Sequence, residues 1–145
     1  MLTTDQKGAI AELAIAHAAA ELGVGVFKAL TDGERYDLIF DFRPQLLRVQ
    51  CKWASLRDGA VVVCCYSCRR NPTRMIVRTY TEDEIDAIAV YCRDTEACYL
   101  IPPQLFMGRR HVYLRVTASR NNQHRGINRA EEFALDARLR ALVGP

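Results

Sequence analysis

The 145-residue chain is long enough to bury a hydrophobic core without disulfides, and half of its residues are hydrophobic. Its longest uncharged apolar run, around residues 60–66, is too short to span a bilayer, and the N-terminus lacks the basic start and apolar core of a signal peptide. We therefore expect one cytoplasmic domain, residues 1–145, whose six cysteines are free thiols.

The net charge is only +3, but the basic residues are unevenly distributed. Residues 67–78 contain four arginines and residues 109–129 contain six, with no carboxylate in either segment. Because a guanidinium group matches a phosphate bidentately, these acid-free segments predict contact with nucleic acid. A GC-rich coding sequence is the alternative explanation for the high total arginine content.

The first predicted element is a helix from Thr3 or Thr4 to Leu22. Thr3 and Gln6 fit a capping box, and Gly23 stands where a helix C-cap is expected. The helix carries two stripes: an apolar one of Ile10, Leu13, Ala14 and His17, and a neighbouring one of small residues around Glu12, namely Gly8, Ala16 and Ala19. We expect His17 at the edge of the core. Glu12 is either a solvated residue or a carboxylate held close to the sheet.

A strand over residues 24–30 and a hairpin over residues 35–52 are expected next. The remaining strands are predicted at residues 60–67, 75–80, 86–92, 97–101 and 111–116, with a basic loop at 69–74, a short helix at 102–107, a polar loop at 119–128 and an amphipathic helix at 129–142. This order indicates an α+β fold with a mixed sheet, a core over about residues 4–101, and a basic loop and helix over about 117–143.

Polar residues interrupt both predicted hairpin strands, which otherwise look buried. A two-residue turn at Arg43-Pro44 places Asp37 opposite Gln50, whereas a four-residue turn places it opposite Lys52. Unpaired polar groups are costly to bury, so the cluster indicates either a structural ion pair at a sheet end or a site for a metal ion and phosphate.

The oxygen donors near this hairpin suit Mg²⁺, which binds one or two carboxylates and retains water. Asp37 and Glu12 offer carboxylates, Gln50 an amide oxygen, and Cys51 its backbone carbonyl. Lys52, on the same strand face as Gln50, would then orient or deprotonate the attacking water and offset phosphate charge.

Cysteine chemistry is a weaker interpretation. Cys65 and Cys68 form a CxxC pair, but Cys65 lies in an apolar run, and Cys92 and Cys98 are separated by five residues. Structural zinc usually takes two close pairs, and no βαβ context surrounds the motif, so core packing is the default for most of these thiols.

The letters KGAIAE in the helix, YD on one hairpin strand and RVQCK on the other resemble the PD-(D/E)xK nuclease superfamily. They resemble most the branch in which Gln replaces the second acid, as in group I intron homing endonucleases of this fold. The resemblance implies an α/β/α-like, restriction-endonuclease-like core in which a mixed sheet is flanked by helices. It also implies Mg²⁺- or Mn²⁺-dependent cleavage of phosphodiester bonds in DNA by a homodimer or higher homo-oligomer.

By position, the resemblance makes Glu12 the helix carboxylate, Asp37 the central metal ligand, Gln50 the variant ligand and Lys52 the catalytic lysine. Tyr36 stands where the family usually has proline. Gln50 leaves the site one negative charge short, so a catalytically weak or inactive nucleic-acid-binding module of the same fold is the alternative.

Residues 80–92 also look like this branch. Glu84 and Asp86 there would orient the site or contact substrate, although capping of the strand start explains Asp86 equally well. The residues expected to contact nucleic acid come from the basic segments: Arg69, Arg70, Arg74, Arg109, Arg110, Arg120, Asn122, Gln123 and Arg125. For the last four of these, a solvated loop that caps the final helix is the alternative.

Overall fold

The computed structural model describes residues 1–70, 72–118 and 125–143, apart from the side chains at positions 69, 70 and 143. Its elements in chain order are α1 (Thr4–Glu21), β1 (Gly25–Lys28), β2 (Leu38–Phe42), β3 (Gln45–Arg57), β4 (Ala60–Cys64), β5 (Tyr66–Arg70), β6 (Met75–Thr79), β7 (Ala87–Cys92), β8 (Ala97–Ile101), α2 (Pro103–Phe106), β9 (His111–Arg115), a 3-10 helix η1 (Ala130–Phe133) and α3 (Leu135–Val143). None of the described helices is long and apolar enough to cross a membrane.

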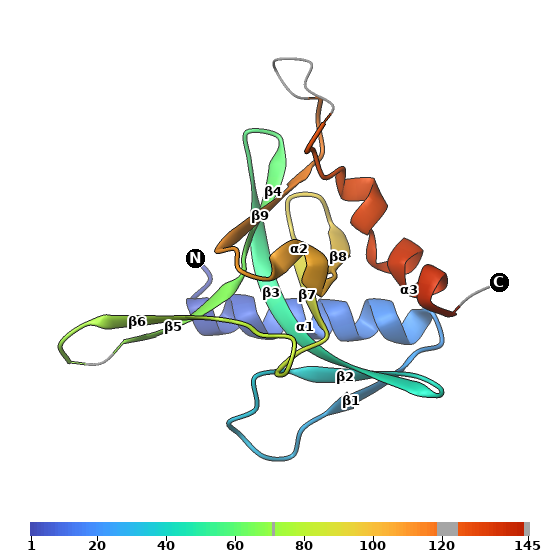
Figure 1. Ribbon diagram of the computed structural model, residues 1–145, viewed down its shortest axis with the longest axis horizontal. Coiled ribbons are helices and arrows are strands. Elements are labelled where there is room, and N and C mark those ends of the chain that lie inside the picture. Colours follow the sequence, from blue (N-terminus) through green and yellow to red (C-terminus); the bar gives the residue numbers. More distant parts are fainter. Residues whose placement is uncertain (71, 119–124, 144–145) are drawn as a thin grey trace.

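The 13-residue strand β3 is the centre of a seven-stranded mixed sheet (Figure 1). Residues 45–49 of β3 pair with β2, residues 49–54 pair in parallel with β7, and residues 55–57 pair with β4. The strands β1, β8 and β9 extend the sheet from β2, β7 and β4 respectively. The predicted α+β fold with a mixed sheet and flanking helices is confirmed.

Helix α1 begins as predicted. The Thr3 side chain accepts a hydrogen bond from the Gln6 backbone, and the Gln6 side chain accepts one from Thr3, which completes the capping box. The helix ends before Gly23, whose φ of +82° favours glycine.

The predicted apolar stripe of α1 was wrong. The buried face consists of Ala11, Ile15 and Ala19, whereas Leu13 and His17 are exposed. His17 lies 3.2 Å from Glu21 and not at the core edge. Alanines of α1 occur on every side of the helix, so the hydrophobic pattern could not determine which side faces the sheet.

The two faces of the sheet carry separate core clusters. On one face, Ile15 and Ala19 of α1 and Leu139 of α3 pack against Val49 and Leu100 of the sheet. On the other face, Phe106 and Ala130 cover Val61, Val90, Leu114 and their neighbours. Burial on both faces explains the nearly continuous apolar run of β7.

Two further expectations needed correction. The first two residues of the predicted basic loop at 69–74 belong to β5, whereas residues 72–74 are irregular and lead into β6; β5 and β6 form a separate hairpin that projects from the body (Figure 1). The predicted helix over 129–142 is divided into η1 and α3, because the extended residue Ala134 forms a bridge with Tyr99.

Candidate active site

The β2–β3 hairpin has the two-residue turn at Arg43-Pro44. Phe42 pairs with Gln45, and Leu38 pairs with Val49. The strand pairing ends at Leu38, and the Asp37 amide donates to the Val49 carbonyl at 2.8 Å, so that Asp37 and Leu38 both lie against Val49 and the register shifts by one residue there. The register opposite Lys52 is thereby excluded.

Asp37 is half-buried just before β2, where the hairpin opens. Its Oδ2 accepts a hydrogen bond of 2.9 Å from the Cys51 backbone N–H. Burial raises the pKa of Asp37, and the nearby Glu12 carboxylate raises it further, although the Cys51 hydrogen bond and the charges of Lys52 and Lys28 act in the opposite direction. A cation bound nearby would therefore stabilise the ionised form of the Asp37 carboxylate.

Glu12 reaches the same end of the sheet from α1. Its side chain is 23% exposed, and its Oε1 lies 2.7 Å from Lys28 Nζ. Lys28 is on β1 and pairs with Leu38, the residue that follows Asp37. Glu12, Lys28 and Asp37 line one polar hollow, which the loop between β1 and β2 completes.

Sequence reasoning missed Lys28. It could have been found by pairing residues 25–28 with 38–41, but a loop of nine residues separates these strands and leaves their register open.

Lys52 is two residues beyond Gln50 and is held on two sides. Its Nζ donates to the Tyr66 carbonyl at 2.9 Å and lies 5.1 Å from the centre of the Tyr80 ring. These contacts join the lysine to both ends of the β5–β6 hairpin, because Tyr66 begins β5 and Tyr80 follows β6. An ammonium group has three donors, and the Tyr66 bond uses one of them.

The backbone N–H and C=O groups of Cys51 point to the side of β3 on which Asp37 lies. In an extended strand the N–H and C=O of one residue point to the same side, and the Cys51 N–H points to Asp37. Since β2 begins only at Leu38, the Cys51 carbonyl is directed past the end of that strand. Two carboxylates and a backbone carbonyl, all of them oxygen donors, thus lie near this end of the sheet.

Asp86 has a structural role. Its carboxylate accepts bonds from the Arg48 backbone N–H at 2.7 Å and from the Arg48 guanidinium at 3.0 Å, and the Asp86 N–H donates to the Arg48 carbonyl. Glu84 pairs with Arg78 at 2.8 Å and with Arg35 at 3.6 Å. Asp86 thus holds the start of β7 against β3. Glu84 holds Arg35 and Arg78 together at the base of the β5–β6 hairpin.

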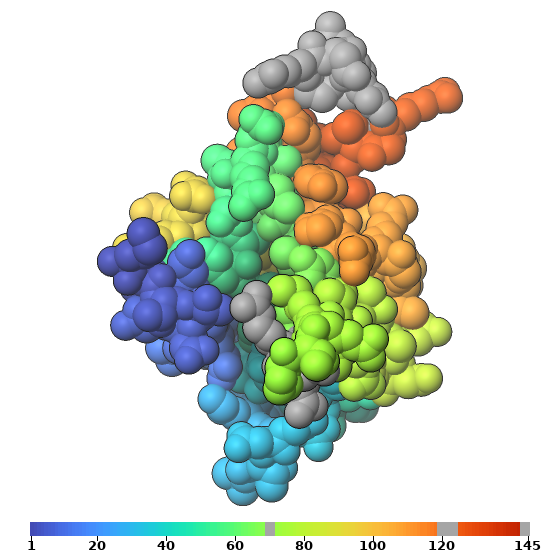
Figure 2. Space-filling model, turned by 90° about the vertical axis from the view of Figure 1, so that its left-hand side faces the viewer, coloured from blue at the N-terminus to red at the C-terminus, as the bar shows by residue number. Residues whose placement is uncertain are grey.

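The residues that the sequence predicts to contact nucleic acid are described to different extents. Arg74, Arg109, Arg110 and Arg125 are exposed. The side chains of Arg69 and Arg70 lie outside the described part, as do Arg120, Asn122 and Gln123 entirely. Figure 2 shows the face from which the hairpin projects, with the start of α1 on one side and β9 on the other.

All six cysteines are free, as predicted. Cys65 is buried, and burial, the leading cause, raises the pKa of its thiol to about 11. Within residues 1–70, 72–118 and 125–143, no group of three or more His, Cys, Asp and Glu side chains is placed to hold a metal ion. A zinc cluster is therefore not formed there.

A family model described as PD-(D/E)XK endonuclease matches residues 2–136. Among solved structures, the chain is similar to a bacterial homing endonuclease, I-Ssp6803I, with a TM-score of 0.75 and 28% sequence identity over 92% of this chain and 89% of the other. No curated protein matches the sequence significantly. The restriction-endonuclease-like fold implied by the sequence is thus confirmed, and the chain belongs to the PD-(D/E)XK endonuclease family.

Proposed function

We propose that this chain is a metal-dependent endonuclease that hydrolyses phosphodiester bonds in DNA. The observation that carries the proposal is the half-buried Asp37 carboxylate. It directly precedes β2, is bound by the Cys51 N–H, and is close enough to Glu12 and Lys52 for their charges to change its pKa. Two carboxylates and a lysine near one end of the sheet support this proposal, because phosphodiester hydrolysis needs metal ligands and a group that offsets phosphate charge.

The residues present fit Mg²⁺ or Mn²⁺. Asp37, Glu12, the Gln50 amide oxygen and the Cys51 carbonyl would hold the ion, and hard divalent cations prefer such an all-oxygen set. The raised pKa of Asp37 supports this assignment, because a buried carboxylate beside a second carboxylate is stabilised by a cation. When bound, the ion supplies Lewis acidity and neutralises charge on the phosphate oxygens.

The protein's own groups position the reaction. Lys52 keeps its ammonium beside the cluster through the Tyr66 carbonyl and the Tyr80 ring, and its remaining donors orient the attacking water or bind a non-bridging phosphate oxygen. Water attacks phosphorus in line, the phosphorus–oxygen bond to the leaving strand breaks, and that oxygen leaves with a proton. Most of this catalysis is positioning and electrostatic stabilisation.

DNA as the substrate is supported by the acid-free arginine segments and by the homing endonuclease to which the chain is similar. We also propose a homodimer or higher homo-oligomer, on the basis of the family resemblance. A second candidate function is a catalytically weak or inactive binding module of this fold. Gln50 motivates it, because an amide replaces a charged ligand.

A nicking assay on plasmid and branched DNA, with and without Mg²⁺, tests the proposal. Asp37→Ala and Lys52→Ala should each lower Mg²⁺-dependent nicking by at least about 1,000-fold while DNA binding persists. Asp41→Ala is the matched control, because Asp41 belongs to the same hairpin and is bonded to Arg43. Wild-type cleavage rates in both site variants would refute the site. A wild type that binds DNA but neither nicks it nor binds Mg²⁺ or Mn²⁺ would favour the binding module.

A further inference from the structure

One face of the β4–β9 strand pair carries aromatic side chains that no described helix buries. Val112 and Leu114 of β9 are in the core, so the alternation of the strand turns His111 and Tyr113 to the opposite face. Tyr113 is 57% exposed, and Val62, its partner on β4, is half-buried. This face is therefore available to a ligand.

The rings on this face form a continuous row. The Tyr66 and His111 rings are 5.6 Å apart and nearly perpendicular, and the His111 and Tyr113 rings are 6.4 Å apart with a 32° tilt. At the other end, the Arg110 guanidinium lies 5.8 Å from the centre of the Tyr66 ring. We call these four residues, Arg110, Tyr66, His111 and Tyr113, the aromatic row.

The surroundings of the aromatic row carry no acid in the sequence. Residues 59–81 and 97–130, which include all four members and their strands, contain neither aspartate nor glutamate. A polyanion that approaches along this face is thus attracted by arginine and is not repelled by carboxylates of these segments.

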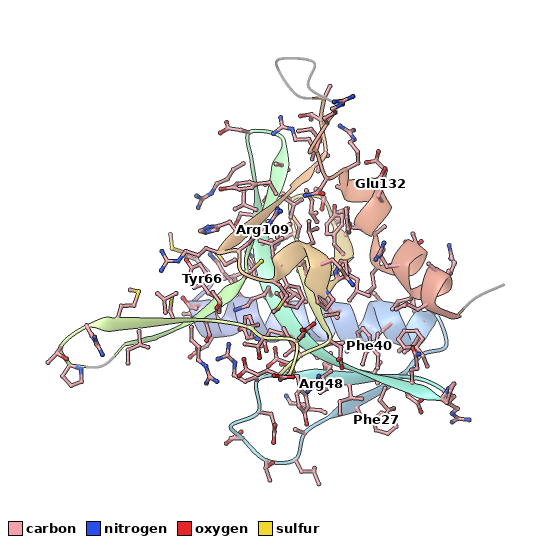
Figure 3. The ribbon with its side chains drawn as sticks, viewed as in Figure 1. Phe27, Phe40, Arg48, Tyr66, Arg109 and Glu132 are labelled. Carbon is pink, nitrogen blue, oxygen red and sulfur yellow. The ribbon has the colours of Figure 1, made fainter. Side chains whose placement is uncertain are left out.

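The aromatic row adjoins the proposed active site. Tyr66 supplies the carbonyl that accepts the 2.9 Å hydrogen bond from Lys52. Figure 3 shows Tyr66 on the side from which the β5–β6 hairpin projects, whereas Phe27 lies away from it, toward β1. A strand whose phosphate reaches Lys52 would therefore pass next to the rings.

We propose that the aromatic row is a stacking subsite for an unpaired nucleotide of the DNA strand being cut, an inference that rests on the proposed nuclease function. Aromatic rings interleaved with arginine bind single strands because every base offers a π-face and every linkage a phosphate. In an intact duplex both faces of each base are covered by neighbouring base pairs, so only an unpaired base can stack on the row. The row thus selects substrates that are forked, bulged or opened beside the cut.

Binding without divalent metal tests the subsite independently of cleavage. Fluorescence anisotropy in EDTA, at one fixed salt concentration, would compare a single strand, a forked duplex and a blunt duplex. Tyr113→Ala should weaken the single strand and the fork by about tenfold and leave the blunt duplex within about twofold. Tyr113→Phe keeps the ring and should bind like the wild type.

Phe27→Ala is the matched control, because Phe27 is also an aromatic residue of a strand and is 56% exposed. The subsite is refuted if Tyr113→Ala and Phe27→Ala behave alike, if Tyr113→Ala weakens all three probes equally, or if Tyr113→Phe loses as much affinity as the alanine variant. If this binding pattern holds but the wild type does not nick DNA, the nuclease function fails and the subsite remains.

Discussion

Replacing Asp86 by alanine is expected to destabilise the fold by about 2–3 kcal/mol without removing the cleavage chemistry. The Asp86 carboxylate accepts three hydrogen bonds from Arg48, at 2.7, 3.0 and 3.0 Å. These bonds join Arg48 in β3 to Asp86, the residue directly before β7. Arg48 is two residues from Gln50 in the sequence.

The magnitude follows from the character of these bonds. A hydrogen bond to a charged group contributes about 1.5–3 kcal/mol, but the three bonds act as one unit, and solvent screens both side chains, which are 33% and 31% exposed. The guanidinium also keeps the carbonyls of Glu82 and Asp83 as partners, which limits the loss.

Urea unfolding measures the effect. With a dependence of about 1–3 kcal/mol per molar urea, a loss of about 2–3 kcal/mol should lower the midpoint by about 0.7–3 M. Burial opposes ionisation of Asp86, but the hydrogen bonds and charge of Arg48 outweigh it and lower the pKa below its ordinary value of 3.8. A carboxyl group with a lowered pKa stabilises the fold above its ordinary pKa, so the difference between wild type and Asp86→Ala should close as the pH falls below 3.8.

Asp94→Ala is the control, because the Asp94 carboxylate accepts one backbone bond from Leu56 at 2.9 Å in an exposed turn. This variant should lose less than about 1 kcal/mol. The reasoning is refuted if Asp86→Ala unfolds at the wild-type midpoint. It is also refuted if folded Asp86→Ala cannot nick DNA, since Asp86 would then belong to the site.

Three further predictions concern the site. Asp37→Asn should raise the melting temperature at pH 7, because the raised pKa of Asp37 costs stability above that pKa; the gain should vanish as the pH falls toward 3.8, which thermal melts can follow. Lys28→Met should tighten Mg²⁺ binding about two- to fivefold in calorimetry, because the Lys28 ammonium no longer competes for Glu12, and unchanged or weaker binding would contradict this. Tyr80→Leu should slow nicking about tenfold and Tyr80→Phe less than threefold, because the ring and not the hydroxyl supports Lys52; equal rates in the two variants would count against it.

The sequence was most informative where the period of the strand fixes side-chain directions. Alternation placed Gln50 and Lys52 on one face, and turn length left two registers for Asp37, of which the two-residue turn at Arg43-Pro44 leaves only the one nearer Gln50. The capping box fixed the start of α1 because it depends on local hydrogen bonds between Thr3 and Gln6.

Contacts between distant segments were not predictable in this way. The buried side of α1 was predicted wrongly because alanines occur on every side of the helix. Lys28 was missed because a loop separates β1 from β2 and leaves the register of the two strands open. The local pattern predicted Tyr80 only as the end of an edge strand. Its contacts with Lys52 and Arg35 join segments that are distant in the sequence, and therefore could not be predicted from that pattern. Side chains that support the site thus depend on topology more than on local pattern.

If Gln50 is a ligand as proposed, the charges around the hairpin account for an amide at that position. Asp37 and Glu12 carry two negative charges, and Lys28 and Lys52 carry two positive charges next to them. A third carboxylate would add an unbalanced charge to a half-buried cluster, which is costly. With Gln50 in place of an acid, the two negative and the two positive charges cancel. A divalent cation that binds alone then adds net positive charge, and a DNA phosphate bound beside it would offset that charge. The site is therefore expected to bind metal more tightly together with DNA than without it.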